Sequence, residues 1–254
     1  SAASGVGAVL HTLNPRLPPD QLLYIVDHAE DTALFFDLTF AKLAEAAARL
    51  PGVKRIVALT DAAHLPPELA ARGFEAYEAV IAPYLDTFDW PVFDENQASS
   101  LCYTSGTAGN PKGVLYSHRS TVMHALGASM ADTIGVCAND RVLPIVPMFH
   151  AMAWGTPYAA GLTGADLVMP GPHLQAAPLT RLITEEHVTV AAGVPTIWLD
   201  FLRHADEVKP DLSGLRMVLC GGAAIPRSLM QGFDERHNVK MVQGWGMTET
   251  SPLG

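Results

Sequence analysis

The sequence is poor in positive charge and in cysteine. Its 254 residues include 16 lysines and arginines against 26 aspartates and glutamates, a net charge of −10, and the basic residues form no cluster. This disfavours a nucleic-acid partner, because binding a phosphate backbone requires clustered positive charge. The three cysteines, Cys102, Cys137 and Cys220, lie far apart, which disfavours a disulfide or zinc framework. They fit reduced thiols in a cytoplasmic protein.

Formal charge is absent between residues 142 and 165. That length would suit a membrane span, but prolines and glycines, among them Pro147, Pro157 and Gly161, argue against one straight helix. We therefore expect no membrane span and interpret the stretch as interior or as the lining of a pocket. The sequence also lacks a Gly-x-Ser-x-Gly motif, which disfavours a serine hydrolase, and its histidines show no metal-ligand spacing.

The most informative segment that is present is YTSGTAGNPKGV, residues 103–114. Its glycines let successive backbone N–H groups turn toward one anion, its hydroxyl groups add donors, and Lys112 supplies charge. We therefore predict a phosphate-binding loop. Pro111 and Gly113 flank the lysine where a Walker loop needs Gly and then Ser or Thr, so this is not a P-loop NTPase. On composition alone, the alternative is a Gly/Ser/Thr-rich surface turn.

Apolar runs with strand character alternate with helical patterns along the chain, which predicts an α/β fold with mostly parallel sheets flanked by helices. The expected strands are 33–36, 55–59, 101–103, 114–116, 166–169, 188–192, 215–220 and 240–242, and the expected helices are 41–50, 179–186, 195–204 and 227–236. Residues 86–98 form an acidic connector between an N-terminal subregion, 1–85, and a larger subregion, 99–254.

A second chemical cluster is GWGMTET, residues 244–250. The indole face of Trp245 can stack on a nucleotide base, Thr248 can donate to a phosphate oxygen, and Glu249 is the hard oxygen ligand that magnesium prefers. The alternative is a tryptophan in the core and a glutamate on a solvated turn. The predicted phosphate loop in the same chain favours the nucleotide-binding interpretation of this cluster.

A third cluster is PMFHAMAWG, residues 147–155. If this run is helical from about residue 149, His150 and Trp154 project from one face. The functional interpretation places His150 near a substrate carboxylate and Trp154 against an apolar chain. A core histidine satisfied by the backbone accounts for these residues equally well.

In this order, the three clusters and GGAAIP at residues 221–226 resemble the adenylate-forming (AMP-binding) superfamily of acyl-CoA synthetases, luciferases and peptide-synthetase adenylation domains. Residues 7–17 and 115–120 are similar to patterns of medium- and long-chain fatty-acid CoA ligases. The resemblance implies ATP-dependent activation of a fatty acid to an acyl-adenylate, followed by thioester formation with coenzyme A.

The same resemblance implies the layered N-terminal domain of the acyl-CoA synthetase type. It implies that residues 1–254 are part of that domain, because a ribose-binding aspartate and a C-terminal domain with a catalytic lysine belong to the family pattern but do not appear. We therefore expect this chain to be inactive by itself. Family members often pair, so a homodimer is compatible with the resemblance.

The resemblance also assigns roles to single residues. It places Thr104, Ser105, Gly106, Thr107, Gly109 and Lys112 at the β- and γ-phosphates, Gly222, Ala223, Ala224 and Trp245 at adenine with Gly246 and Met247 beside them, Thr248 at the α-phosphate, Glu249 at Mg²⁺, and His150 and Trp154 at the acyl entrance. The implied catalytic set is Lys112, His150, Thr248 and Glu249. Ala108 stands where the family usually has a hydroxyl residue, so we expect a weaker hold on phosphate, which backbone amides can offset.

Two alternatives stay open. One is a related adenylating enzyme, for example a ligase for an amino acid or for a short or thioether acid. The uncharged run 142–165 offers no carboxylate to pair with an ammonium group, which disfavours an amino acid but does not set the chain length. The other is a non-catalytic nucleotide-binding module.

Overall fold

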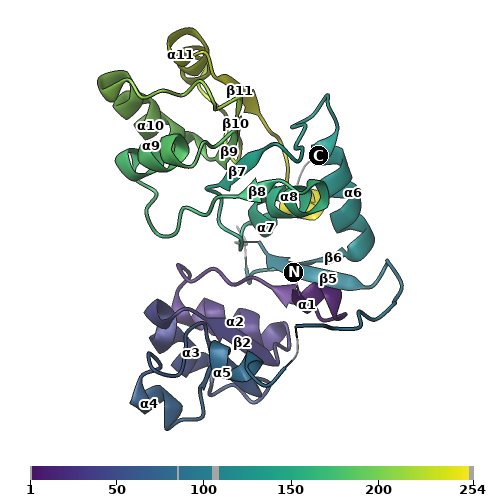
Figure 1. The fold of residues 1–254 in the computed structure, drawn as a ribbon. Coiled ribbons are helices and arrows are strands. Elements are labelled where there is room, and N and C mark those ends of the chain that lie inside the picture. The colour runs from purple at the N-terminus through teal and green to yellow at the C-terminus, as the bar shows by residue number, and fades with distance from the viewer. Residues whose placement is uncertain (1, 85, 105–108, 252–254) are drawn as a thin grey trace. The chain divides into compact units, whose positions relative to one another are not determined.

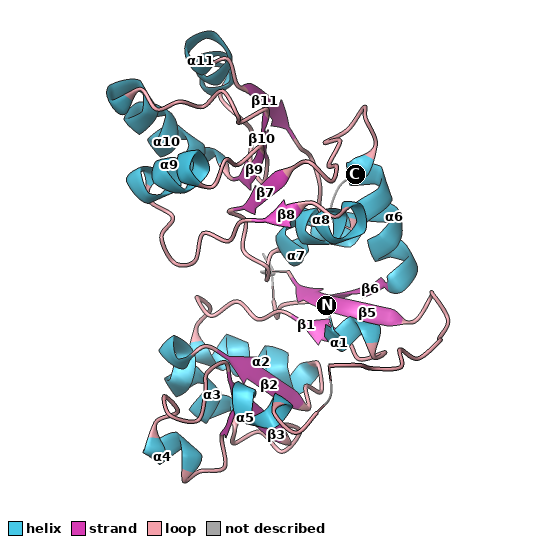
Figure 2. Ribbon diagram, in the orientation of Figure 1, coloured by secondary structure: helices cyan, strands magenta, loops and turns pink. Residues whose placement is uncertain are grey.

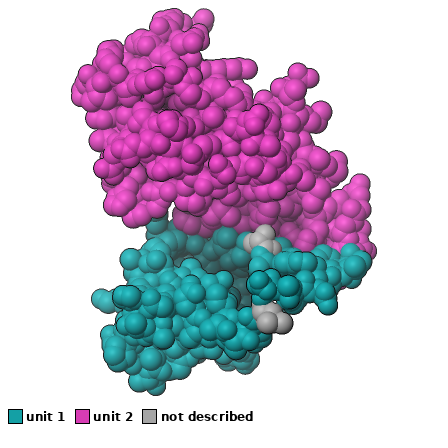
Figure 3. All heavy atoms as spheres, in the orientation of Figure 1, with its two compact units in different colours: residues 1–93, 103–113 teal, residues 94–102, 114–254 magenta. Residues whose placement is uncertain are grey.

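The computed structural model describes residues 2–84, 86–104 and 109–251, and it confirms an α/β fold with parallel sheets flanked by helices (Figures 1 and 2). The chain divides into two compact units (Figure 3). The smaller unit comprises residues 1–93 and 103–113, and the larger comprises 94–102 and 114–254. Strands β5 (Ala98–Tyr103) and β6 (Gly113–Ser117) are neighbours in a sheet. Two of the boundaries between the units fall inside them, after Cys102 and after Gly113.

The smaller unit contains a parallel three-stranded sheet in the order β2-β3-β4. Its strands are β2 (Ala33–Phe36), β3 (Arg55–Ala58) and β4 (Glu75–Ala76), and β1 (Leu10–His11) lies outside this sheet. Its helices are α1 (Ala2–Gly5), α2 (Pro19–His28), α3 (Ala41–Ala47), α4 (Pro67–Ala70) and α5 (Tyr77–Ile81), with a 3₁₀ turn at Leu38–Phe40. Phe36 and Phe74 meet edge to face in its core, with ring centroids 5.8 Å apart. The helix expected over 41–50 ends at Ala47, three residues earlier than expected and ahead of Pro51.

The larger unit contains a five-stranded parallel sheet in the order β11-β10-β9-β7-β8. Its strands are β7 (Arg141–Pro144), β8 (Asp166–Leu167), β9 (Val190–Gly193), β10 (Met217–Cys220) and β11 (Lys240–Gln243). Its helices are α6 (His118–Ser129), α7 (Ala151–Trp154), α8 (Thr156–Thr163), α9 (Ala176–Glu185), α10 (Pro195–Val208) and α11 (Arg227–His237), with a 3₁₀ turn at Thr248–Thr250. Helices α9, α10 and α11 cover one face of the sheet, and α6 and α8 cover the other (Figure 1).

The central strands are buried on both faces. Along β10, Val218 and Cys220 enter the cluster under α9 to α11, whereas Met217 and Leu219 enter the cluster under α6 and α8. A strand covered on both sides has no polar face, and this explains the continuous apolar runs in the sequence. Burial raises the pKa of the Cys220 thiol to about 12, so this core cysteine is protonated at neutral pH. The three cysteines are free thiols, as predicted.

Helix starts follow local chemistry. Ser117 precedes α6 and caps it, because its hydroxyl accepts a hydrogen bond from the Ser120 backbone N–H at 3.0 Å. Pro195 opens α10 in the first turn, where a proline is tolerated. This helix continues to Val208, beyond the expected end at residue 204, and stops where Lys209 adopts a left-handed φ of 49°.

A charged network joins the amino ends of three neighbouring strands, β7, β9 and β10. The carboxylate of Asp140, which is 4% exposed, accepts hydrogen bonds from Arg216 Nε at 2.8 Å, Arg216 Nη2 at 2.7 Å and the Thr189 hydroxyl at 2.7 Å. The Cys137 backbone N–H also donates to it, at 2.9 Å. Burial alone would raise the pKa of Asp140, but these hydrogen bonds and the guanidinium charge outweigh it and hold the pKa well below its ordinary value.

No helix in the described ranges is long and apolar enough to cross a bilayer. Among the same residues, no group of three or more His, Cys, Asp or Glu side chains is arranged to hold a metal ion.

Candidate functional site

The lysine loop, which is residues 104–112 of the predicted phosphate-binding segment, has a closed neck formed by Thr104 and Lys112. The Thr104 backbone N–H donates to the Lys112 carbonyl at 2.9 Å, and the Thr104 hydroxyl reaches the same oxygen at 3.4 Å. Gly109 has a φ of +95°, a conformation that L side chains rarely adopt. Lys112 is exposed, and its ammonium pairs with no carboxylate of the described residues. Four predicted loop residues, Ser105, Gly106, Thr107 and Ala108, lie outside the described residues, so the phosphate contacts stay a prediction.

Two glycine-containing segments leave the same edge of the large sheet. Strands β10 and β11 are parallel and end in register, with Cys220 opposite Gln243, so residues 221–224 and 244–250 emerge side by side. The Gly244 N–H donates to the Cys220 carbonyl at 2.8 Å. A Cβ at position 221 would lie 2.8 Å from the Gly244 carbonyl oxygen, so only glycine permits this approach. The carboxyl ends of parallel strands are where ligands bind in such sheets.

The residues at this edge are accessible. Trp245 is 63% exposed and Met247 is 47% exposed, which excludes a core position for the indole. Gly222, Ala223, Ala224, Gly246 and Glu249 are also exposed. An exposed aromatic face beside small residues is suited to stacking on a planar base. The exposed Glu249 is accessible to a cation carried by a ligand.

Tyr116 connects the 244–250 segment to strand β6. Its hydroxyl donates to the Thr248 carbonyl, across 132 positions of sequence, and its side chain is buried. Burial raises the pKa of Tyr116, and nearby Cys102 and Glu249 add to the effect, so the hydroxyl stays a donor. Tyr116 follows Lys112 by four positions, so this hydrogen bond joins residue 248 to the strand that begins just after the lysine loop. Sequence reasoning missed Tyr116, because a tyrosine in a short strand carries no local signal of such a contact.

The expected helical face containing both His150 and Trp154 is wrong. His150 is extended, with φ −104° and ψ 95°, and the next four residues, 151–154, have φ between 42° and 55°. This left-handed turn does not follow right-handed i, i+4 spacing. His150 is exposed, which excludes the core-histidine alternative, although neighbouring atoms remove enough water to lower its pKa.

Trp154 packs against Gly221, the first residue after β10. It is 6% exposed, and a Cβ at Gly221 would lie 3.3 Å from its ring. A left-handed conformation costs an L-residue about 1–2 kcal/mol. Four such residues in succession, all buried, therefore hold appreciable backbone strain, and strain of this kind concentrates at functional sites.

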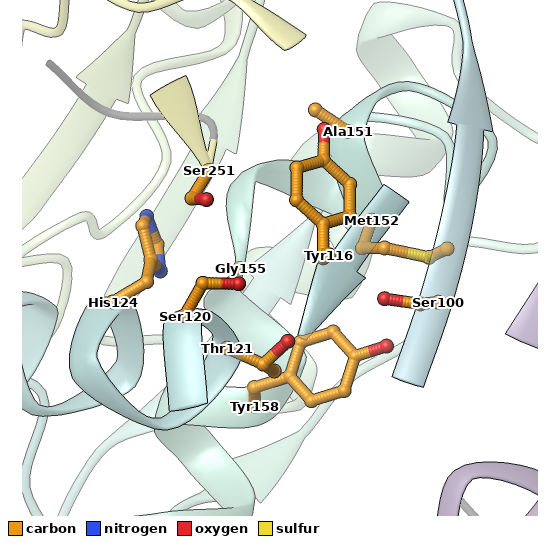
Figure 4. A pocket seen from close by; sticks show the side chains of 10 residues that line it. All are labelled: Ser100, Tyr116, Ser120, Thr121, His124, Ala151, Met152, Gly155, Tyr158 and Ser251. Carbon is orange, nitrogen blue, oxygen red and sulfur yellow. The ribbon is translucent and has the colours of Figure 1, made fainter. Parts of the chain in front are cut away.

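A pocket opens beside this turn (Figure 4). It encloses about 280 Å³ of empty space, part of it open to solvent, and is lined by Ser100, Tyr116, Ser120, Thr121, His124, Ala151, Met152, Gly155, Tyr158 and Ser251. Six of these ten residues carry a hydroxyl group. Hydroxyl groups and apolar surface therefore line the pocket together.

His124 forms one wall of the pocket. Burial lowers its pKa, and its Nε2 atom is buried without a hydrogen-bond partner among the described residues. A Cβ at Gly155 would lie 2.2 Å from the imidazole, so only a glycine lets the ring pack there. No sequence pattern indicated that His124 packs against Gly155, since the two residues are 31 positions apart.

Comparison with known proteins relates these features to a family. The AMP-binding enzyme family matches residues 1–254. The chain is 50% identical over 258 residues to the 3-methylmercaptopropionyl-CoA ligase of Ruegeria lacuscaerulensis, covering 100% of this chain and 47% of that protein. It is 48% identical over 256 residues to the medium-chain-fatty-acid–CoA ligase of Ectopseudomonas oleovorans, covering 100% of this chain and 46% of that protein.

Solved structures share the fold. The anthranilate CoA ligase AuaEII, in complex with anthranoyl-AMP, superposes with a TM-score of 0.85 at 24% identity, over 98% of this chain and 46% of that one. The inhibitor-bound N-terminal domain of FACL13 from Mycobacterium tuberculosis gives a TM-score of 0.78 at 26% identity, over 98% of this chain and 59% of that one. The chain spans about half the length of the curated relatives it matches. It belongs to the AMP-binding enzyme family.

Proposed function

We propose that the polypeptide containing this chain activates a carboxylic acid with ATP and transfers the acyl group to coenzyme A. The observation that carries the proposal is the single edge formed by β10 and β11, where residues 221–224 and 244–250 emerge together. The hydrogen bond from Tyr116 to Thr248 adds support, because it anchors the proposed α-phosphate contact to the strand that follows the lysine loop.

The proposed chemistry has two steps. A carboxylate oxygen attacks the α-phosphorus and pyrophosphate leaves, which forms an acyl-adenylate; the thiol sulfur of coenzyme A then attacks the acyl carbon, loses its proton, and AMP leaves. The carboxylate is ionised at neutral pH and needs no general base. Catalysis therefore consists of alignment and charge neutralisation.

Each proposed contact uses a group of matching chemistry. Lys112 and the loop amides hold the β- and γ-phosphates, and Thr248 donates to the α-phosphate. Adenine lies between Trp245 and the segment 222–224. These residues supply donors and an exposed aromatic face, and no side chain among them has to change protonation.

Magnesium fits the residues present. Mg²⁺ is usually held by one or two carboxylates together with substrate phosphates. Glu249 is an exposed carboxylate, and the described residues contain no larger cluster of metal ligands, so the ion would arrive with the nucleotide. When bound, it neutralises charge that develops on the phosphates.

A medium- or long-chain fatty acid is our first candidate substrate, with His150 and Trp154 at the acyl entrance. Relatives with such names, including the long-chain-fatty-acid–CoA ligase of Thermus thermophilus at 46% identity, support it. A short thioether acid is the second candidate. The relative at 50% identity carries that name, and the hydroxyl groups among the pocket residues are donors that a heteroatom in a short acid can use.

Pyrophosphate exchange tests the proposal. The full-length polypeptide is assayed with octanoate, palmitate and 3-methylmercaptopropionate, beside the 254-residue chain alone. Exchange with the two alkyl acids supports the first candidate, and exchange confined to the thioether acid supports the second. ATP binding without exchange for any acid would favour a nucleotide-binding module.

We also propose that the isolated chain is inactive, that the protein is cytoplasmic and that it pairs as a homodimer.

A further inference from the structure

Four side chains of the smaller unit lie together, and one of them belongs to the residue just before the lysine loop. Tyr103 is the last residue of β5, His11 ends β1, His28 ends α2, and Asp31 follows α2. The His11 and Tyr103 rings lie 5.2 Å apart, and the His28 and Tyr103 rings lie 5.9 Å apart, edge to face. The proposed chemistry assigns no role to any of the four.

Asp31 orients His11. The carboxylate lies 2.8 and 3.0 Å from the His11 Nδ1 atom, and both side chains are largely buried. The opposite ring nitrogen, Nε2, is buried with no hydrogen-bond partner in the described part of the chain. A proton on Nε2 would therefore be unsatisfied, whereas a proton on Nδ1 is donated to Asp31. The imidazole is thus held in one orientation, inclined at 33° to the Tyr103 ring.

His28 holds the other end of Tyr103. The distance from His28 Nδ1 to the Tyr103 hydroxyl is 2.6 Å, and the Tyr24 ring packs 5.3 Å from the His28 ring. Burial raises the pKa of Tyr103, and nearby Tyr24 and Asp31 add to the effect. The phenol therefore stays protonated, and its oxygen shares a hydrogen bond with His28 Nδ1. Two contacts, one at the ring and one at the hydroxyl, leave Tyr103 little freedom.

The next residue along the chain forms the neck of the loop. Thr104 bonds to the carbonyl of Lys112 through its N–H, at 2.9 Å, so an anchored Tyr103 also fixes where the loop leaves and returns. A lysine whose backbone is held in place before the ligand arrives binds it more tightly, because less freedom is lost on binding. We propose that Tyr103, held by His28 and His11, is a positioning residue that fixes Thr104 and Lys112 at the neck of the loop for a nucleotide triphosphate. This inference rests on the proposed function.

Calorimetric titration of the full-length polypeptide with ATP, in the absence of acid, tests the inference. Tyr103→Phe keeps the ring and removes the hydroxyl, so we expect the Kd for ATP to rise about two- to tenfold, the effect of one hydrogen bond. In turnover assays the KM for ATP rises by the same factor, while kcat and the KM for the acid are unchanged. Tyr84→Phe is the matched control, because Tyr84 is 74% exposed, and it leaves the Kd unchanged.

Two variants of His28 separate positioning from general stability. His28→Leu removes the hydrogen-bond partner of Tyr103 and weakens ATP binding as Tyr103→Phe does, whereas His28→Asn keeps a polar atom near the Nδ1 position and restores most of the affinity. An unchanged Kd in both Tyr103→Phe and His28→Leu would overturn the inference. It would also fail if both His28 variants lost affinity equally together with a lower Tm.

The inference and the proposed function fail differently. A wild-type protein that binds ATP but exchanges no pyrophosphate contradicts the proposed function, and the Kd comparison still decides the role of Tyr103. A wild-type protein that binds no ATP overturns both.

Discussion

Replacing Ala153 with glycine tests the left-handed turn. Ala153 is fully buried and has φ 54° and ψ 42°. An L-residue in this region loses about 1–2 kcal/mol to the contact between its Cβ and the following carbonyl. Glycine occupies the region without that cost, so Ala153→Gly relieves strain in the folded state.

Two losses oppose the gain. Removing a buried methyl group costs about 0.8 kcal/mol, and the greater freedom of glycine in the unfolded chain costs about 0.4–1 kcal/mol. The three contributions nearly cancel, so we expect Ala153→Gly to change the free energy of unfolding by less than about 1 kcal/mol. Ala160 is the matched control, because it is also 0% exposed but lies in the right-handed helix α8. There, glycine costs about 1 kcal/mol in helix propensity and about 0.8 kcal/mol for the methyl, near 2 kcal/mol together.

Urea unfolding followed by tryptophan fluorescence measures both variants. Trp154, Trp198 and Trp245, three of the four tryptophans, belong to the larger unit, so the signal reports on the unit that contains both alanines. An equal loss of about 2 kcal/mol in the two variants would refute the reasoning, since a right-handed turn at residue 153 predicts that equality.

Three further predictions follow from the site and the sheet. Asp140→Asn should lower the free energy of unfolding by about 2 kcal/mol at neutral pH, since it weakens charge-assisted hydrogen bonds to Arg216. Because the folded-state pKa of Asp140 is lowered, its stabilisation is complete above the ordinary carboxyl pKa and is lost as the pH falls below about 4, so urea titrations should show a weaker acid dependence in the variant than in the wild type. Lys112→Ala in the full-length polypeptide should raise the KM for ATP about tenfold with little change in the KM for the acid, and an unchanged ATP dependence would contradict its proposed role. Glu249→Gln should shift the magnesium titration of pyrophosphate exchange to higher concentration, and a titration that superposes on the wild type would contradict metal binding there.

Much of the fold was predictable because it depends on short-range patterns. The apolar runs around Val190 and Val218 indicated strands of a mostly parallel sheet, and the register of β9 and β10 confirms them. The structure adds that β10 and β11 end in register, so the segments 221–224 and 244–250 share one edge. The roles assigned to single residues in the lysine loop and around Glu249 stay predictions, because they concern a ligand.

Other features could not be predicted because no local pattern encodes them. Residues 151–154 contain no glycine, and only packing against the surrounding core explains why they adopt a left-handed turn. Local spacing therefore favoured a right-handed helix and wrongly put His150 and Trp154 on one helical face. The carboxylate of Asp140 likewise gave no sign that it would meet Thr189 and Arg216, 49 and 76 positions later.

By itself the sequence determined the α/β alternation and the order of the three clusters, since periodicity acts over a few residues. The tertiary structure alone decided which distant groups meet: Tyr116 with Thr248, His124 with Gly155, and Tyr103 with His11 and His28. Such contacts depend on how strands and helices pack across long stretches of chain, and packing is a property of the whole fold.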